Sequence, residues 1–169
     1  KTKTKQNEQK TLLDEGLRAI DTHFIGACLA LAHRSLCRGN VPIGALVVDS
    51  NHRVISTGQN QADPLGHAEI ESIRRALAVR SLCGRLSGCT LYVSVEPCVM
   101  CVGAAQLARV SRIVYGCANT KFGFFSAAQA SLAPHGVYSH VKEISGGICS
   151  DESAALLRQY FTIKRAKHS

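Results

Sequence analysis

Two short motifs constrain this chain more than any other feature of its sequence. The first is His67-Ala68-Glu69, and the second is Pro97-Cys98-Val99-Met100-Cys101. Zinc prefers thiolate and imidazole ligands, and zinc sites in proteins are mostly tetrahedral. Cys98 and Cys101 are spaced i and i+3, so on one turn of helix they would share a face. A fold that brings the two motifs together would hold zinc with His67, Cys98 and Cys101.

Three protein ligands leave one coordination position open, which distinguishes catalytic from structural zinc. Zinc lowers the pKa of a water molecule in such a position to roughly 7. Glu69 is two residues from His67 and would not project from the same helical face, so we expect it beside the metal as a proton carrier. The alternative is a structural zinc knuckle with Glu69 as an ordinary helix N-terminal acid. A knuckle needs a fourth ligand, and no second CxxC or HxxxH motif is present.

The residues around the second motif predict where its thiols lie. Pro97 suits the first position of a helix, where its missing N–H costs nothing. Cys98 and Cys101 would then lie in the first turn. Free backbone N–H groups and the helix dipole favour negatively charged sulfur there.

Apolar periodicity divides the rest of the chain into alternating helices and strands. We expect helices over residues 12–38, 67–80, 97–108 and 151–163, a short one across 126–132, and strands over 43–48, 53–57, 90–95, 112–115 and 141–144. Ser150 is the expected N-cap of the last long helix. This order predicts an α/β fold, a sheet covered by helices on both faces. Both motifs follow strands, and such crevices are where open α/β sheets bind ligands.

The net charge of +8 is concentrated at the two ends of the chain. Residues 1–11 carry four lysines and one glutamate, and residues 158–169 carry four basic residues and no acidic one. Basic ends on a nearly neutral body favour a polyanionic partner, most simply nucleic acid, although solubilising tails would look the same. We expect a disordered segment over 1–11, one domain over 12–163, and a basic tail over 164–169.

The remaining cysteines and the hydropathy add little chemistry. Without a secretory signal, a CxxC motif more often means metal or redox chemistry than a disulfide. The other six cysteines are interpreted as small buried or idle thiols: Cys28, Cys37, Cys83, Cys89, Cys117 and Cys149. No run approaches the roughly 18 apolar residues of a membrane span. We therefore expect an intracellular protein, in the cytoplasm or nucleus of a eukaryote or in the cytoplasm of a bacterium.

Together, H-A-E and P-C-x-x-C resemble the signature of zinc-dependent nucleobase deaminases. Over about residues 12–165 the chain is similar to the tRNA adenosine deaminase family of bacteria and eukaryotes. The similar stretches are residues 41–45, 58–60, 63–69, 91–101 and 151–157. The resemblance implies a three-layer α/β/α fold of the cytidine deaminase type, with a central mixed five-stranded sheet and one catalytic zinc ion.

The resemblance also implies an activity, the hydrolysis of adenosine to inosine at the wobble position of a tRNA anticodon. The anticodon loop is single-stranded, so its base can enter a pocket at small unstacking cost. By family match, Asn60 would hydrogen-bond the purine, whereas the residues alone equally allow a turn asparagine. Glu96 would be structural or would support the metal ligands. The basic residues Lys164, Arg165 and Lys167 would contact tRNA.

A finer resemblance concerns residues 114–123, which are similar to the catalytic subunit of the eukaryotic enzyme. That enzyme pairs with a related subunit that lacks the catalytic glutamate, so the presence of Glu69 would make this chain the active partner. We therefore expect a heterodimer, with a homodimer as the alternative. Phe124-Phe125-Ser126 departs from the glycine- and serine-rich run that is usual in the family, which leaves the substrate contacts of this loop open.

Two other functions remain open from the sequence. The same zinc core would serve a deaminase of free nucleobases or nucleosides such as cytosine, cytidine or guanine. The third hypothesis is a binding subunit in which zinc only organises the fold. Activity on a free nucleoside but not on tRNA would favour the former, and a fourth protein ligand on the metal would favour the latter.

Overall fold

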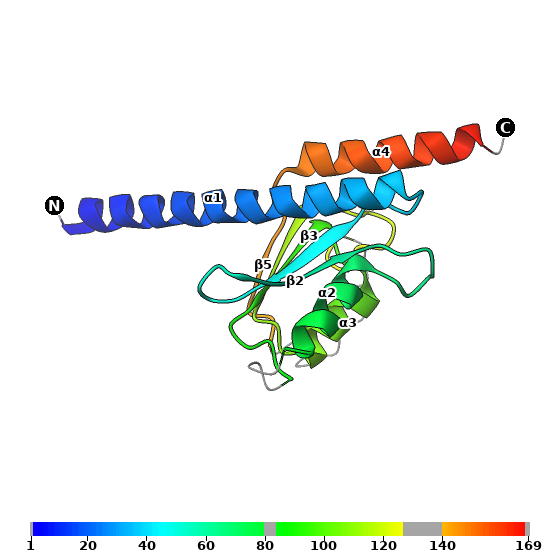
Figure 1. Ribbon diagram of the computed structural model, residues 1–169. Helices are drawn as coiled ribbons and strands as arrows, with labels where there is room; N and C mark the ends of the chain where they lie inside the picture. Colours follow the sequence, from blue (N-terminus) through cyan, green and yellow to red (C-terminus); the bar gives the residue numbers. More distant parts are fainter. Residues whose placement is uncertain (1, 80–83, 127–139, 168–169) are drawn as a thin grey trace.

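The computed structural model describes residues 2–79, 84–126 and 140–167 as a three-layer α/β/α structure (Figure 1). The elements are α1 (Thr2–Cys37), β1 (Gly44–Val48), β2 (Val54–Gln59), α2 (Ala68–Leu77), β3 (Thr90–Val95), α3 (Val99–Leu107), β4 (Arg112–Cys117), β5 (Glu143–Ser145) and α4 (Ser150–Ala166). The predicted α/β class with helices on both faces is confirmed. The expected short helix across 126–132 falls almost wholly outside the described residues.

The five strands form one mixed sheet in the order β2-β1-β3-β4-β5. β1 is antiparallel to both β2 and β3, whereas β3, β4 and β5 are parallel. β2, β3 and β4 therefore point the same way and end at the same edge of the sheet. Segments that follow these three strands meet at that edge, where the two sequence motifs also lie.

Side chains alternate between the two faces of the sheet, as the two-residue period of a strand requires. Ala45, Val47, Leu91 and Val93 pack into a core with α2 and α3. Their neighbours Leu46, Val48 and Tyr92 face the other way. Together with Val114 of β4 they pack against Phe24, Ile25 and Cys28 of α1. α1 and α4 lie together on this second face (Figure 1).

A buried ion pair fixes α1 to the sheet. The Asp21 carboxylate accepts two hydrogen bonds from the Arg112 guanidinium, at 2.6 and 2.8 Å, and one from the Tyr92 hydroxyl at 2.9 Å. Asp21 is 3% exposed, so the fork geometry of arginine and the tyrosine hydroxyl satisfy a charge that would otherwise be costly to bury. This clamp sets the position of α1 relative to β3 and β4.

Several helix boundaries differ from the sequence predictions; among them, α4 continues to Ala166, into the segment that was expected to be a basic tail. α1 begins at Thr2 rather than at residue 12, so residues 2–11, which were expected to be disordered, are helical. The side chains from Thr11 to Ala19 are exposed, and this part of α1 projects beyond the sheet (Figure 1). The N-cap of α4 is Cys149 in a left-handed conformation, not Ser150. The N–H of Ile148 donates to the carbonyl of Tyr115, which holds the incoming chain on β4 until that turn.

α3 begins at Val99, two residues later than predicted. Cys98 is its N-cap, with an extended backbone (φ −77°, ψ 172°), so the prediction that Pro97 is the first helical residue is wrong. A bridge between Cys98 and Gly123 keeps Cys98 extended and delays the start of the helix. None of the helices in the described ranges is both long and apolar enough to span a membrane.

Candidate active site

The three predicted ligands converge in the structure. His67 Nδ1 lies 3.6 Å from Cys98 Sγ and 3.4 Å from Cys101 Sγ, and the two sulfur atoms are 3.7 Å apart. A tetrahedral zinc ion with Zn–S of about 2.3 Å and Zn–N of about 2.0 Å requires ligand separations of about 3.5–3.8 Å. The donor set and its spacing therefore fit zinc.

Two helix N-termini point at this centre. His67 is the N-cap of α2 and Cys98 is the N-cap of α3, while Cys101 lies in the first turn of α3. Each N-terminus contributes free N–H groups and the positive end of a helix dipole, which favour negative charge at the ligands. The sequence places a ligand at the start of each helix, and the sheet brings the two starts together.

The pKa values of the two thiols are shifted in opposite directions. The hydrogen bond with Cys101 and the contact with His67 lower the pKa of Cys98 to about 4. The same contact with Cys98, together with burial, raises the pKa of Cys101. Cysteine binds a metal as the thiolate, so the lowered pKa of Cys98 suits a metal ligand, and both thiols would be deprotonated with zinc bound.

Glu69 lies beside the ligands and is 3% exposed. Its Oε2 atom is buried and has no hydrogen-bond partner among the described residues. Burial is the main reason that the pKa of this carboxyl is raised, which makes Glu69 a better proton acceptor than an exposed glutamate. A buried, unpartnered carboxylate oxygen is costly unless something else occupies the site, so it marks a position for a substrate or solvent partner.

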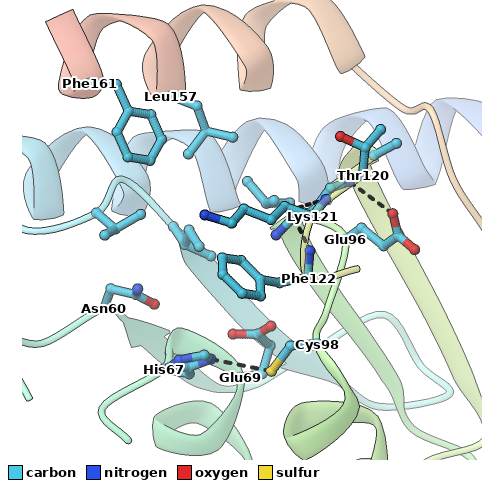
Figure 2. Close-up of a pocket in the computed structure, with 15 residues that line it drawn as sticks. Asn60, His67, Glu69, Glu96, Cys98, Thr120, Lys121, Phe122, Leu157 and Phe161 are labelled. Carbon is cyan, nitrogen blue, oxygen red and sulfur yellow. Dashed lines mark hydrogen bonds between the residues drawn. The ribbon is translucent and has the colours of Figure 1, made fainter. Parts of the chain in front are cut away.

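These groups form the floor of a pocket of about 610 Å³, a volume typical of small-molecule sites. Figure 2 shows His67, Glu69 and Cys98 together, with Phe122 above them and Leu157 and Phe161 reaching in from α4. Residues that follow β2, β3 and β4 supply most of the lining. The pocket is thus the crevice at the carboxyl ends of these strands, as predicted.

Asn60, for which the family resemblance implies a contact to the purine, follows β2 and lines the pocket. Its Oδ1 accepts a hydrogen bond from the Ala68 N–H at 2.9 Å, which satisfies an N–H in the first turn of α2. Its main-chain carbonyl accepts from the Ser35 hydroxyl at 2.9 Å. No described residue bonds the Nδ2 group of Asn60, and the side chain lines the pocket, so this amide is available as a donor.

The predicted RNA-contacting residues lie at the end of α4. Lys164 and Arg165 occupy its last turn, and Lys167 is its C-cap. The N-terminal end of α1, with the other basic segment, lies on the opposite side of the molecule (Figure 1). Only the α4 end continues a helix that lines the pocket.

Sequence reasoning missed several pocket residues. Leu157 and Phe161 come from α4, and their i, i+4 spacing after the buried Ser153 is a signal that could have identified that face. Lys121 and Phe122 come from the loop after β4, and the Lys121 Nζ lies 5.0 Å from the centre of the Phe122 ring. Nothing in the local sequence indicates that this loop lies above the metal ligands.

Comparison with known proteins agrees with this geometry. Residues 18–117 match the family model of the cytidine and deoxycytidylate deaminase zinc-binding region. A tRNA-specific adenosine deaminase from Agrobacterium fabrum is 36% identical over 148 residues, which cover 85% of this chain and 95% of that protein. A tRNA(Ile)-lysidine synthase from Deinococcus deserti is 39% identical over 84% of this chain, but this chain spans only 27% of its length.

A solved structure from biochemical and structural studies of A-to-I editing by tRNA:A34 deaminases has the same fold. It superimposes with a TM-score of 0.72 at 36% sequence identity, covering 80% of this chain and 99% of that chain. The match includes the mixed five-stranded sheet, so the expected cytidine deaminase type of α/β fold is confirmed. This chain is a member of the cytidine and deoxycytidylate deaminase family of zinc-dependent enzymes, and within it belongs with the tRNA-specific adenosine deaminases.

Proposed function

We propose that this chain hydrolyses adenosine to inosine at the wobble position of tRNA anticodons. The observation that carries this proposal is the buried Oε2 of Glu69, unpartnered among the described residues, beside three zinc-ligand atoms on the floor of a pocket of about 610 Å³. The names of the relatives supply the substrate, and the pocket volume suits a nucleobase with its ribose. The basic end of α4 provides charge for the phosphates of an RNA.

His67, Cys98 and Cys101 would hold the zinc ion. When bound, zinc lowers the pKa of a coordinated water to about 7 and so supplies a nucleophile at neutral pH. Glu69 Oε2 would accept one proton of the attacking water and give it to the purine ring nitrogen. It would then accept the proton of the hydroxyl group formed on the ring and give it to the departing amine. The atoms balance, because water enters at the amino-bearing carbon and ammonia leaves.

Asn60 and the pocket walls would orient the base. The Nδ2 group of Asn60 would donate a hydrogen bond to a purine acceptor. Asn60 Oδ1, which accepts from the Ala68 N–H, keeps α2 and His67 in place. Phe122, Leu157 and Phe161 supply apolar surface that excludes bulk water from the reacting carbon. Lys164, Arg165 and Lys167 would contact the tRNA backbone.

The competing functions fit less well. Among the described residues, the ligand group comprises only His67, Cys98 and Cys101, so a purely structural four-ligand site lacks its fourth member there. A deaminase of free nucleobases would use the same floor, but it would have no use for a cationic end on a helix that lines the pocket.

The test is an inosine assay with the purified, zinc-loaded chain, alone and with a candidate partner subunit, on tRNA transcripts and on free adenosine, cytidine and guanine. We expect inosine in the tRNA only. Turnover of a free base or nucleoside, with none on tRNA, would contradict the proposal.

A second subunit is a further part of the proposal. We infer a heterodimer with a related, catalytically inactive deaminase-like subunit, with a homodimer as the alternative, in the cytoplasm or nucleus of a eukaryotic cell or in the cytoplasm of a bacterium. The mass of the purified chain by light scattering, and the inosine assay with and without a candidate partner, test this part. A monomer that is fully active alone would contradict it.

A further inference from the structure

Glu96 is a second buried carboxylate at the pocket, and among the described residues its hydrogen-bond donors are backbone N–H groups. It lies directly after β3 and is 2% exposed. Its Oε2 accepts from the Asn119 N–H at 2.8 Å, and its Oε1 accepts from the N–H groups of Phe125 and Ser126 at 2.7 and 2.6 Å. None of the ion pairs between described residues includes it. Hydrogen bonds to an ionised carboxylate are about twice as strong as neutral ones.

The three N–H donors bracket the loop that forms one wall of the pocket. Residues 118–122 line the pocket, and Asn119 and Phe125 lie on either side of Phe122. In Figure 2, Glu96 lies beside Thr120, away from the floor formed by His67 and Glu69. Glu96 therefore fastens both ends of the wall to the strand that leads into the metal centre.

Further contacts join the same two segments. The Phe124 N–H donates to the Pro97 carbonyl at 3.0 Å, and Gly123 forms a β-bridge with Cys98. Within the loop, Asn119 Oδ1 accepts from the Phe122 N–H at 3.1 Å, which shapes the turn that presents the Phe122 ring. The wall is thus tied to Pro97 and Cys98, the two residues that follow Glu96, as well as to Glu96 itself.

Gly123 leaves room for this carboxylate. A Cβ atom added at Gly123 would overlap the Glu96 carboxyl group and the Asn119 carbonyl oxygen. The φ of Gly123 is not in the left-handed region, so its backbone conformation does not require a glycine. The close approach of the Glu96 carboxyl group does. A substitution at Gly123 would therefore displace the carboxylate without changing its chemistry.

We propose that Glu96 is a positioning residue that sets how tightly the pocket holds the substrate base. Its carboxylate fixes the Asn119–Phe122 wall over the floor and takes no part in proton transfer. The effect on substrate rests on the proposed function, whereas the effect on the loop does not. Because the wall contacts substrate and transition state alike, its displacement weakens binding more than it slows the chemical step.

The first experiment needs no substrate. In Glu96→Gln, one carboxylate oxygen becomes an NH₂ group that faces backbone N–H donors. The hydrogen bonds to that oxygen are lost, and those to the remaining oxygen are weakened because their acceptor is no longer charged. We expect amide hydrogen exchange at Asn119, Phe125 and Ser126 to accelerate by about tenfold or more in the zinc-loaded chain. Glu71→Gln is the matched control, because Glu71 forms only a surface pair with Arg75. Unchanged exchange at the three amides would overturn the proposal.

The second experiment measures kinetics on an anticodon stem-loop. Glu96→Gln is expected to raise KM about tenfold, with kcat within about threefold of wild type and zinc content unchanged. Gly123→Ala should produce the same pattern, and it provides a second variant should Glu96→Gln fold poorly. A loss of zinc, or a fall in kcat at constant KM, in the folded variants would overturn the proposal. A wild-type chain inactive on tRNA, both alone and with a candidate partner subunit, would instead refute the proposed function, and the exchange result would still decide the role of Glu96.

Discussion

The floor and the wall of the pocket each contain one buried glutamate, and the two are used differently. Glu69 on the floor and Glu96 at the wall are 3% and 2% exposed. Both Glu96 oxygens accept hydrogen bonds from the backbone, whereas Glu69 Oε2 is buried without a partner among the described residues. Burial alone therefore does not identify the reactive acid. The distinguishing feature is the oxygen that the fold leaves unsatisfied.

This difference predicts two kinds of defect. Changes on the floor, at the metal ligands and Glu69, should lower kcat or abolish activity. Changes on the wall and at the α4 end should raise KM and leave the chemical step nearly intact. A floor variant that only raises KM, or a wall variant that only lowers kcat, would contradict this distinction.

The largest effect is expected from removing a metal ligand. Cys101→Ala deletes one of three ligands, so we expect loss of zinc, no detectable inosine, and a lower melting temperature because metal binding to the native state stabilises it. Metal analysis and thermal unfolding measure these effects, and chelation of the wild-type chain should reproduce the lower melting temperature. Cys89→Ala is the control, since Cys89 is a buried core thiol away from the ligands. Full zinc content in Cys101→Ala would contradict the ligand assignment.

The next effect separates the two glutamates directly. Glu69→Gln keeps the size of the side chain but removes the proton acceptor, so we expect kcat to fall by about 10²–10⁴-fold with zinc retained. Single-turnover inosine formation is the measurement. If Glu96→Gln lowered kcat more than Glu69→Gln, the roles would be reversed.

Asn60 combines two roles: its Oδ1 accepts from the Ala68 N–H of α2, and its Nδ2 is the proposed donor to the base. Asn60→Ala leaves the Ala68 N–H without its acceptor, at a cost of about 1–3 kcal/mol, and removes the donor for the base. Asn60→Asp keeps the acceptor but lacks the donor. We expect Asn60→Asp to recover most of the stability lost in Asn60→Ala, while kcat/KM stays reduced by about ten- to hundredfold. Equal activity of Asn60→Asp and wild type would show that Asn60 is only a cap.

The smallest effect is expected at the end of α4. Replacing Lys164, Arg165 and Lys167 together by glutamine should weaken tRNA binding several-fold and make the salt dependence shallower by about 2 in log–log slope. The replacement should leave kcat unchanged. Binding measured at several salt concentrations gives the slope, with the exposed Lys142→Gln as the control. An unchanged slope would mean that the cationic end only solubilises the chain.

Local sequence determined the parts of the site that depend on short spacing. The ligands His67, Cys98 and Cys101 were identified because zinc chemistry restricts the residue types, and the strand at residues 90–95 because its side chains favour a pleated strand. The two ends of the chain were less predictable. Residues 2–11 form part of α1, although their polar, charged composition indicated disorder.

Only the tertiary structure decided which residues surround the ligands. Cys98 caps α3 instead of lying within it because Gly123 pairs with it across the pocket. Glu96 is satisfied by N–H groups more than twenty residues further along the chain, and Phe161 lines the pocket from the last helix. A sequence records residue types and spacing, whereas these contacts depend on where three strands end in one sheet. For this protein, spacing therefore specified the metal chemistry, and the common edge of β2, β3 and β4 specified the pocket that uses it.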